Sequence, residues 1–226
     1  MIPISCVDNF YEDPDSIRKF ALSLDYNKED GNYPGYRTKE LHSVNQEFSQ
    51  WCINKIISLF FSGRYKGHGW TMFQKIYPFH EDPNHPLNQG EIHFDDGNVI
   101  AGLIYLNPNP RLDSGTSFYQ LKEEYKDFSF SDLTAAKSKC YKDGNCEEFE
   151  KEIQENNSKF EKTLEVKNVY NRLIFFGANS YHSQTNLYMR KDDFRFTQVF
   201  FIDKLEADSR SPLDRFNRFS QKEFTL

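Results

Sequence analysis

Apolar residues recur at helical spacing in the first third of the chain. Residues 14–24 carry one apolar face, and Asp13 stands where an N-cap belongs. A second amphipathic helix is predicted over residues 43–60, with Ser43 opening a capping box. The polar, Gly- and Tyr-rich residues 27–37 between them are predicted to form a loop.

From Trp70 onward the apolar period changes to that of strands. Strands are predicted over residues 2–8, 70–77, 99–106, 114–119, 169–176 and 194–202. Short strands separated by turns are typical of a sandwich or barrel rather than a βαβ fold. The pattern therefore predicts a mainly β protein with flanking helices, in the α+β class.

The length of the chain fits a single domain over residues 1–226. Its expected parts are a helical N-terminal support (1–69), a β core (70–203), an insertion within that core (120–166) and a C-terminal tail (204–226). Residues 146–164 of the insertion are predicted to form a charged surface helix over the mouth of a site. A solvated insertion with no role in chemistry is the alternative. The tail is expected to be a docked or frayed helix.

Charge and cysteine usage narrow the function classes. The net charge is −6, so the chain lacks the basic footprint of a phosphate binder, and nucleic acid is not an expected partner. We see no secretory signal and no apolar run long enough for a membrane span. Cys140 and Cys146 are close in sequence, but their spacing does not fit a zinc knuckle. All four cysteines are predicted to be free thiols in a cytoplasmic protein.

A His-x-Asp pair stands in residues 90–97, which are predicted to be extended. On a strand, His93 and Asp95 point to the same side. They supply two of the three groups of a 2-His-1-carboxylate triad, and His182, behind a distant buried strand, is the candidate third. A hydrogen-bonded polar pair on a sheet face is the alternative. The remaining histidines are predicted to be surface or turn residues: His42, His68, His80 and His85.

The last predicted strand places Arg195 and Thr197 on one face. An arginine inside an aromatic-rich strand is unfavourable unless it meets an anion, and its planar fork suits a carboxylate. A structural salt bridge is the alternative. Arg190 is a rival anion anchor, but it stands in a turn beside Lys191 and Asp192, so Arg195 is preferred.

Taken in order, these motifs resemble the Fe(II)/2-oxoglutarate-dependent dioxygenases, most closely the prolyl-4-hydroxylase branch, over roughly residues 70–203. The matching motifs are His93-x-Asp95, Ile104-Tyr105-Leu106-Asn107, Ser114-Gly115-Thr116-Ser117-Phe118, Asn171-Arg172-Leu173-Ile174-Phe175-Phe176, His182 and Arg195-x-Thr197. The N-terminal segment is similar, more weakly, to uncharacterised phage and bacterial relatives. The family's usual Gly-Gly-Thr turn is Ser114-Gly115-Thr116 here, which we expect to be tolerated.

The resemblance implies a double-stranded β-helix core, a cupin-like jelly roll, with helices on one side. It also implies site roles, with no catalytic residue beyond the metal ligands. Fe(II) would be bound by His93, Asp95 and His182, and the distal carboxylate of the co-substrate 2-oxoglutarate by Arg195, Thr197 and Tyr105.

The implied reaction uses O2 to hydroxylate a peptide or protein side chain or a small molecule, and it converts 2-oxoglutarate to succinate. Ascorbate is an optional addition. Asp95 favours hydroxylation over halogenation, because halogenating relatives lack this carboxylate. The main alternative is a non-catalytic jelly-roll module that binds a metal or ligand. A nucleic-acid demethylase is disfavoured by the charge, and a capsid or tail jelly roll would make the triad coincidental. Substrate and oligomeric state stay open.

Overall fold

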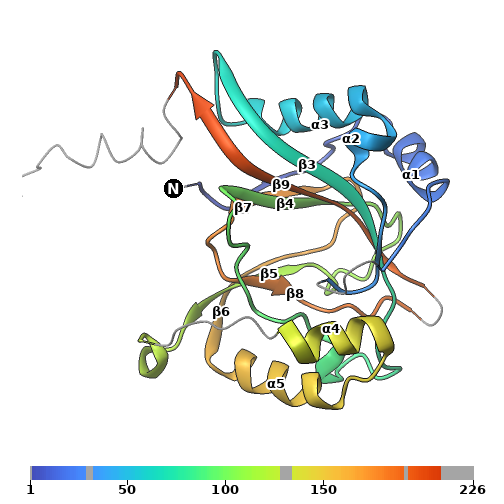
Figure 1. Ribbon diagram of the computed structural model, residues 1–226, viewed down its shortest axis with the longest axis vertical. Coiled ribbons are helices and arrows are strands. Elements are labelled where there is room, and N and C mark those ends of the chain that lie inside the picture. Colours follow the sequence, from blue (N-terminus) through green and yellow to red (C-terminus); the bar gives the residue numbers. More distant parts are fainter. Residues whose placement is uncertain (1, 29–32, 128–133, 191–192, 210–226) are drawn as a thin grey trace, which may run out of the picture.

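The computed structural model describes residues 2–28, 33–127, 134–190 and 193–209. Within these ranges two antiparallel sheets face each other (Figure 1). The larger sheet has the strand order β1-β7-β4-β9-β3-β2 and the smaller one β6-β5-β8. The strands are β1 (Ser5–Val7), β2 (Tyr36–Arg37), β3 (Tyr65–Ile76), β4 (Ile100–Tyr105), β5 (Thr116–Leu121), β6 (Phe160–Val166), β7 (Leu173–Gly177), β8 (His182–Gln184) and β9 (Arg195–Ala207).

The chain winds between the two sheets. It leaves β4 of the larger sheet for β5 and β6 of the smaller one, and then returns to β7. It crosses again to β8 and back to β9. This winding of facing antiparallel sheets confirms the predicted mainly β fold with a jelly-roll core and flanking helices.

Three helices cover the outer face of the larger sheet: α1 (Pro14–Leu22), α2 (Leu41–Val44) and α3 (Gln46–Ser58). Asp13 caps α1 as predicted, accepting a hydrogen bond from the Ser16 amide at 3.0 Å. The start of the next helix was predicted wrongly. Ser43 lies inside α2, and Asn45 caps α3 by accepting from the Phe48 amide at 3.0 Å. Apolar side chains of these helices pack on the sheet, where Phe73, Phe196 and Phe200 are fully buried.

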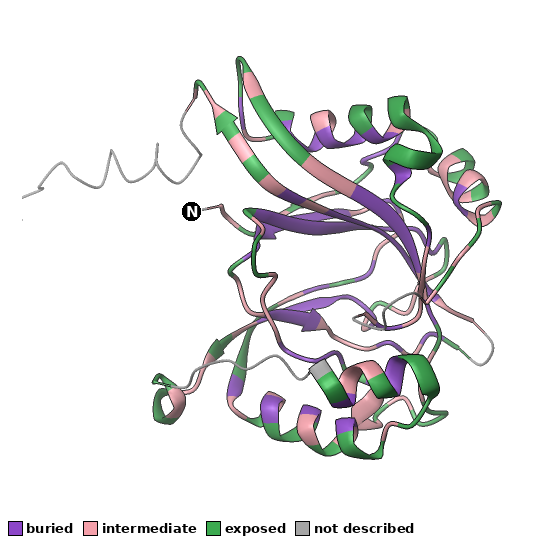
Figure 2. Ribbon diagram, in the orientation of Figure 1, coloured by how far each residue is buried: buried purple, intermediate pink, exposed green. Residues whose placement is uncertain are grey.

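A second apolar cluster lies between the sheets, where β4 and β7 are buried along their whole length (Figure 2). Leu103 of β4 and Val199 of β9 meet Phe118 of the smaller sheet there. Because side chains alternate along a strand, Arg195 and Thr197 share the inward face of β9 with Val199. The site therefore lies in the interior between the sheets, away from the α1–α3 layer.

The segment predicted as an insertion contains two helices and then a core strand. Helix α4 (Thr134–Asp143) and helix α5 (Glu147–Ser158) lie beyond the smaller sheet in Figure 1. The helix predicted over residues 146–164 ends at Ser158, and Phe160 begins β6, which pairs with β5. Phe160 and Leu164 are four residues apart, a spacing that a helix shares with one face of a strand, so the apolar spacing alone could not separate the two.

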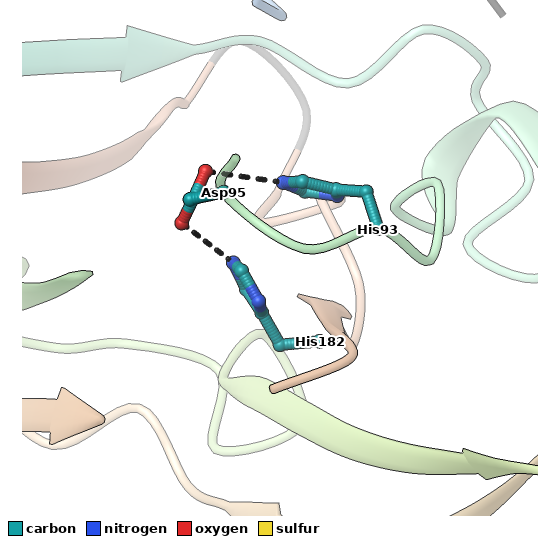
Figure 3. Close-up of side chains that lie close together, drawn as sticks. All are labelled: His93, Asp95 and His182. Carbon is teal, nitrogen blue, oxygen red and sulfur yellow. Dashed lines mark ion pairs between the residues drawn. The ribbon is translucent and has the colours of Figure 1, made fainter. Parts of the chain in front are cut away.

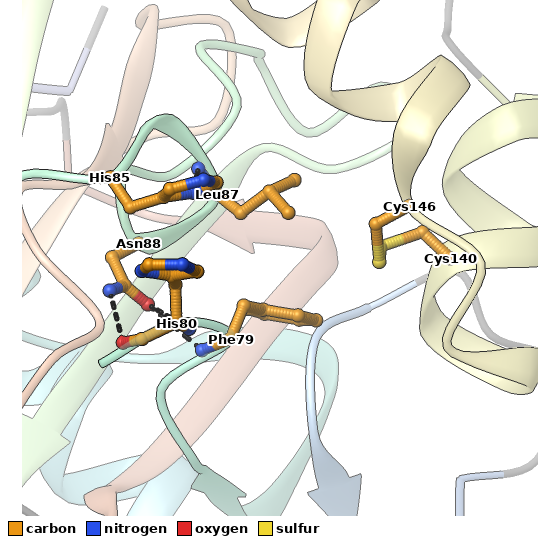
Figure 4. Close-up of a disulfide and its surroundings, with 7 residues drawn as sticks. All are labelled: Phe79, His80, His85, Leu87, Asn88, Cys140 and Cys146. Carbon is orange, nitrogen blue, oxygen red and sulfur yellow. Dashed lines mark hydrogen bonds between the residues drawn. A yellow bond between two sulfur atoms is a disulfide. The ribbon is translucent and has the colours of Figure 1, made fainter. Parts of the chain in front are cut away.

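Cys140 and Cys146 form a disulfide, which corrects the prediction that all cysteines are free thiols. The turn between α4 and α5 brings the end of one helix beside the start of the other. Figure 4 shows the disulfide facing the loop that carries Phe79 and Leu87. Those two side chains pack against an apolar cluster formed by α4 and α5, which includes Cys140. Cys6 and Cys52 are free, as predicted.

The remaining elements adjust the predicted boundaries. Tyr36–Arg37 forms β2 inside the segment predicted to be a loop, and β9 continues to Ala207 beyond the predicted start of the tail. Residues 210–226, including most of that tail, lie outside the described ranges. Two 3-10 turns complete the elements, η1 (Pro86–Asn88) and η2 (Glu123–Tyr125). None of the described helices has the length and apolar character needed to cross a membrane.

Candidate metal centre

His93, Asp95 and His182 converge on one point (Figure 3). Nε2 of His182 lies 3.4 Å from Oδ2 of Asp95, and Nε2 of His93 lies 3.8 Å from Oδ1 of the same carboxylate. One nitrogen or oxygen from each residue lies within 4.8 Å of the other two. The three predicted ligands therefore form a cluster of the composition that holds Fe(II) in facial-triad sites.

The segment around His93 is not the regular strand that we predicted. His93 makes an isolated antiparallel bridge to His182, with backbone N–H···O distances of 3.1 and 2.8 Å. The Asp95 amide donates to the Ala178 carbonyl at 2.8 Å, and the chain then turns at Gly97. Extended backbone over the three residues still places His93 and Asp95 on one side, so the expected spatial relation holds without a strand.

Gly90 allows this segment to approach β8. A Cβ at this position would lie 2.3 Å from Oε1 of Gln184 and 2.6 Å from its backbone nitrogen. Any side chain would therefore push the segment away from β8. Glycine here brings His93 next to His182.

Both histidines present Nε2 to the cluster. Nδ1 of His93 lies 2.8 Å from the Glu91 carbonyl, and Nδ1 of His182 lies 2.9 Å from the Ser180 carbonyl. A carbonyl oxygen only accepts hydrogen bonds, so Nδ1 carries a proton in each ring, and Nε2 is the nitrogen that faces Asp95. Burial, together with the neighbouring His93, lowers the pKa of His182 to about 4. His182 is therefore neutral at physiological pH, as a metal ligand must be.

Helix α5 holds the backbone that precedes His93. Asn157 accepts a hydrogen bond from the Ile92 amide at 2.9 Å and donates to the Gly90 carbonyl at 3.0 Å. Asn156 donates to the Ile92 carbonyl at 2.9 Å. Helix α5 of the predicted insertion therefore supports the backbone next to His93.

Arg195 is buried in the interior, with only 1% of its surface exposed. Its Nε donates to the Ser114 carbonyl at 2.9 Å, and its guanidinium carbon lies 5.4 Å from the centroid of the Tyr105 ring. No described carboxylate lies within ion-pair distance of Arg195, so the structural salt bridge has no acidic partner there. Burial lowers the pKa of this guanidinium. Arg190, the rival anchor, is exposed.

A small cavity of about 70 Å³ joins Arg195 to the three candidate ligands, all of which line it. Thr116 also lines this cavity and hydrogen-bonds the hydroxyl of Tyr105 at 2.8 Å. Tyr105 and Thr197 do not line the cavity, but they pair across β4 and β9 beside Arg195. The Thr197 hydroxyl is buried and has no hydrogen-bond partner among the described residues.

A larger cavity of about 490 Å³ adjoins the candidate metal ligands. Sequence reasoning missed its lining residues outside the triad. They include Arg37 from β2, Lys137 and Tyr141 from α4, Gln184 from β8 and Phe201 from β9. The only sequence signal for Phe201 was its shared face with Arg195. Arg37 stood in a segment predicted to be a loop.

The structure is similar to solved proteins at low identity. Against HygX from Streptomyces hygroscopicus with nickel and 2-oxoglutarate bound, the TM-score is 0.48 and the identity 10%, over 88% of this chain and 82% of that one. Against a prolyl hydroxylase from Trichoplax adhaerens in complex with a hypoxia-inducible-factor peptide, the TM-score is 0.49 and the identity 13%, with the same coverage.

Comparison by sequence gives the family. No curated protein matches the chain. Residues 2–192 match a family of unknown function, DUF6445, and this range includes all three residues of the His93, Asp95 and His182 cluster. The chain therefore belongs to the DUF6445 family.

Proposed function

We propose that this protein is an Fe(II)- and 2-oxoglutarate-dependent oxygenase. His93, Asp95 and His182 would hold the metal, and Arg195 and Thr197 would hold the distal carboxylate of 2-oxoglutarate, with a further hydrogen bond from Tyr105. When bound, the metal and the co-substrate would supply the chemistry that adds oxygen from O2 to a substrate C–H bond, with 2-oxoglutarate converted to succinate and CO2.

The observation that carries this proposal is the buried Arg195 without an acidic partner. A buried guanidinium is unfavourable unless an anion compensates its charge. The described protein atoms offer it backbone carbonyls and the Tyr105 ring but no carboxylate. A carboxylate from a bound molecule would complete the site, and the cavity that Arg195 lines leads to the candidate metal ligands.

The residues also fit the two groups in detail. The donor set is two imidazoles and one carboxylate, and the backbone carbonyls fix each imidazole through Nδ1. The buried Thr197 hydroxyl, with no described partner, adds a hydrogen-bonding group beside Arg195. Burial raises the pKa of the Tyr105 phenol, so its hydroxyl keeps its proton and can donate.

The chain's own residues would orient and enclose the reaction. Arg195 would fix one end of the co-substrate so that its other end faces the metal ligands. Val199 and Phe176 line the same small cavity and would exclude water from it. The larger cavity beside His93 and Asp95 would admit the substrate.

The test is anaerobic titration of the protein with Fe(II) and 2-oxoglutarate, watched for the weak visible charge-transfer band of the chelate. Wild type should give the band, and His182→Ala should not. Arg195→Met should give the band only at a 2-oxoglutarate concentration about tenfold or more higher, because a charge-assisted hydrogen-bonded pair is lost. Arg172→Met is the matched control, because Arg172 pairs with Asp8 near the surface.

Admitting O2 then tests turnover through succinate formation. A folded wild-type protein that gives no band would contradict the proposal. A band without succinate, across candidate substrates, would instead indicate a binding module.

A further inference from the structure

Arg37 lies where the two cavities meet. It lines the small cavity that contains Arg195 and also the larger cavity beside the candidate metal ligands. His93, Asp95, Gln184 and Phe201 are likewise shared by both. A cation at this junction faces the space that a substrate would occupy next to the metal.

The backbone of Arg37 is fixed by pairing on both sides. Arg37 is opposite Gln74 of β3. Its amide donates to the Asn27 carbonyl at 2.9 Å, and its carbonyl accepts from the Asn27 amide at 2.8 Å. Gly35 precedes β2 with φ +76°, and a Cβ there would lie 2.1 Å from the Lys75 carbonyl oxygen. The close approach of this loop to β3 therefore needs glycine, and it sets the direction of the Arg37 side chain.

The guanidinium of Arg37 is packed between aromatic rings, and the Asp95 carboxylate is near enough to interact with its charge without forming an ion pair. The guanidinium carbon of Arg37 lies 4.0 Å from the Tyr33 ring centroid and 5.9 Å from that of Phe201. Its Nε is buried without a hydrogen-bond partner, and Arg37 makes no ion pair with any described residue. Burial lowers the pKa of Arg37 to about 10, so the group is still charged at neutral pH.

We propose that Arg37 binds a carboxylate of the molecule that this site oxidises, an inference that rests on the proposed oxygenase function. A guanidinium stacked on a ring keeps its planar edge available, and that edge matches a carboxylate with two parallel hydrogen bonds. The larger cavity is also lined by Glu91, Asp95 and Asp96. These acids disfavour a dianion such as a phosphate ester more than a monocarboxylate.

Arg195 would then bind the carboxylate of the co-substrate, and Arg37 would bind the carboxylate of the substrate. Arg195 is fully buried between the sheets and opens only to the small cavity, as a co-substrate anchor would. Arg37 opens to the large cavity as well, whose volume of about 490 Å³ suits a small molecule or the end of a peptide. Substrates of this site should therefore carry a free carboxylate at one end.

The experiment uses the full-length ¹⁵N-labelled protein and follows the arginine Nε–Hε resonances by NMR. Metal-free protein, and then protein loaded with Zn(II) and 2-oxoglutarate, is titrated with acetate. Acetamide is the neutral probe of the same shape, and inorganic phosphate is the rival anion. The Nε–Hε resonance of Arg37 should shift saturably with acetate and not with acetamide in both forms of the protein. That resonance should be missing from Arg37→Gln.

Followed on the backbone amide resonances that acetate shifts in wild type, Arg37→Gln should weaken acetate binding about tenfold or more. The 2-oxoglutarate midpoint of its Fe(II) chelate band should be unchanged. Arg37→Lys, which keeps the charge without the fork, should bind acetate more weakly than wild type. It also serves if the glutamine variant does not fold. Arg64→Gln is the control, since Arg64 is exposed and pairs with Asp208.

Acetate binding of wild-type strength in both Arg37 variants would overturn the proposal, as would the lack of any saturable shift in wild type. An equal loss of acetate and 2-oxoglutarate affinity would assign Arg37 to the co-substrate instead. Phosphate binding tighter than acetate would replace the carboxylate with a phosphate group. Failure of the chelate band in wild type would refute the oxygenase function separately, because the metal-free titration reports Arg37 without it.

Discussion

Arg195 and Thr197 face the interior from the same strand, and each carries a polar group whose pairing the described protein atoms leave incomplete. The Arg195 charge has carbonyl partners but no acid, and the Thr197 hydroxyl has no partner. A buried hydroxyl without a hydrogen bond lowers stability by roughly 1–3 kcal/mol relative to a bonded one. Both groups therefore favour a bound anion over the ligand-free state.

Replacing Thr197 with valine tests this directly, because valine has nearly the same shape without the hydroxyl. Thr197→Val should leave the free energy of unfolding of the ligand-free protein unchanged or raise it by up to about 1 kcal/mol. The affinity for 2-oxoglutarate should fall about tenfold, since one hydrogen bond to a charged group is lost. Urea unfolding and the chelate titration measure the two effects.

Thr71→Val is the matched control for this prediction. The Thr71 hydroxyl is also buried, but it donates to the Val199 carbonyl at 2.8 Å and lies 3.0 Å from Nε2 of Gln198. Its loss should destabilise the protein by roughly 1–3 kcal/mol and leave 2-oxoglutarate affinity unchanged. If Thr197→Val destabilised as much as Thr71→Val, the hydroxyl would have a structural role instead.

The relative direction of two side chains could be predicted where it depends only on neighbouring backbone. His93 and Asp95 point to the same side because side chains alternate along extended backbone, and Arg195 and Thr197 share a face for the same reason. Arg37 could not be found this way, because β2 has two residues and its position depends on Gly35 and on pairing with β3. Whether the triad binds a metal stays a prediction.

At the scale of elements, α5 acts as a support for the segment that carries His93. Its two asparagines make three hydrogen bonds to the backbone of residues 90–92. Removing a group that holds a metal ligand in position by hydrogen bonding typically weakens metal affinity by about 10–100-fold. The helix is itself joined to α4 by the Cys140–Cys146 disulfide.

Asn157→Ala should therefore weaken metal binding about tenfold, although Asn157 is not a ligand. The reason is that the Ile92 amide and the Gly90 carbonyl lose their partner, and His93 is held less firmly. Competition with a Zn(II) indicator measures the affinity. Gln154→Ala, an exposed position on the same helix, should change nothing. Equal affinities in the two variants would contradict the supporting role of α5.

Helices and strands with a clear apolar period were predicted correctly, and strands that depend on pairing with a distant strand were not. The apolar faces of α1 and α3 and the core strands β4 and β9 follow from spacing, although Trp51, an apolar residue of α3, is 46% exposed. Strand β6 was taken for helix because its assignment comes from pairing with β5. The disulfide was missed because a reducing compartment was assumed before the α4–α5 turn was known.

At the scale of the whole molecule, the candidate site adds polar connections between the two sheets to the apolar cluster that already packs between them. Arg195 of the larger sheet bonds carbonyls of residues 114 and 115, just before β5 of the smaller sheet. His93 and His182 bring the loop of residues 90–97 against β8. A metal and an anion bound there would therefore stabilise the two sheets against separation.

Saturating Zn(II) and 2-oxoglutarate should raise the unfolding temperature of the whole domain in one transition. A ligand that binds only the folded state at a hundredfold excess over its Kd adds about 2.7 kcal/mol. For a domain of this size that corresponds to a rise of about 5–10 °C, measured by scanning calorimetry. In Arg195→Met, the rise in unfolding temperature due to Zn(II) should remain, and the further rise due to 2-oxoglutarate should be lost. In His182→Ala, both contributions should be lost. An equal rise in wild type and His182→Ala would mean that the metal binds elsewhere, and the triad would then be a polar cluster without a ligand.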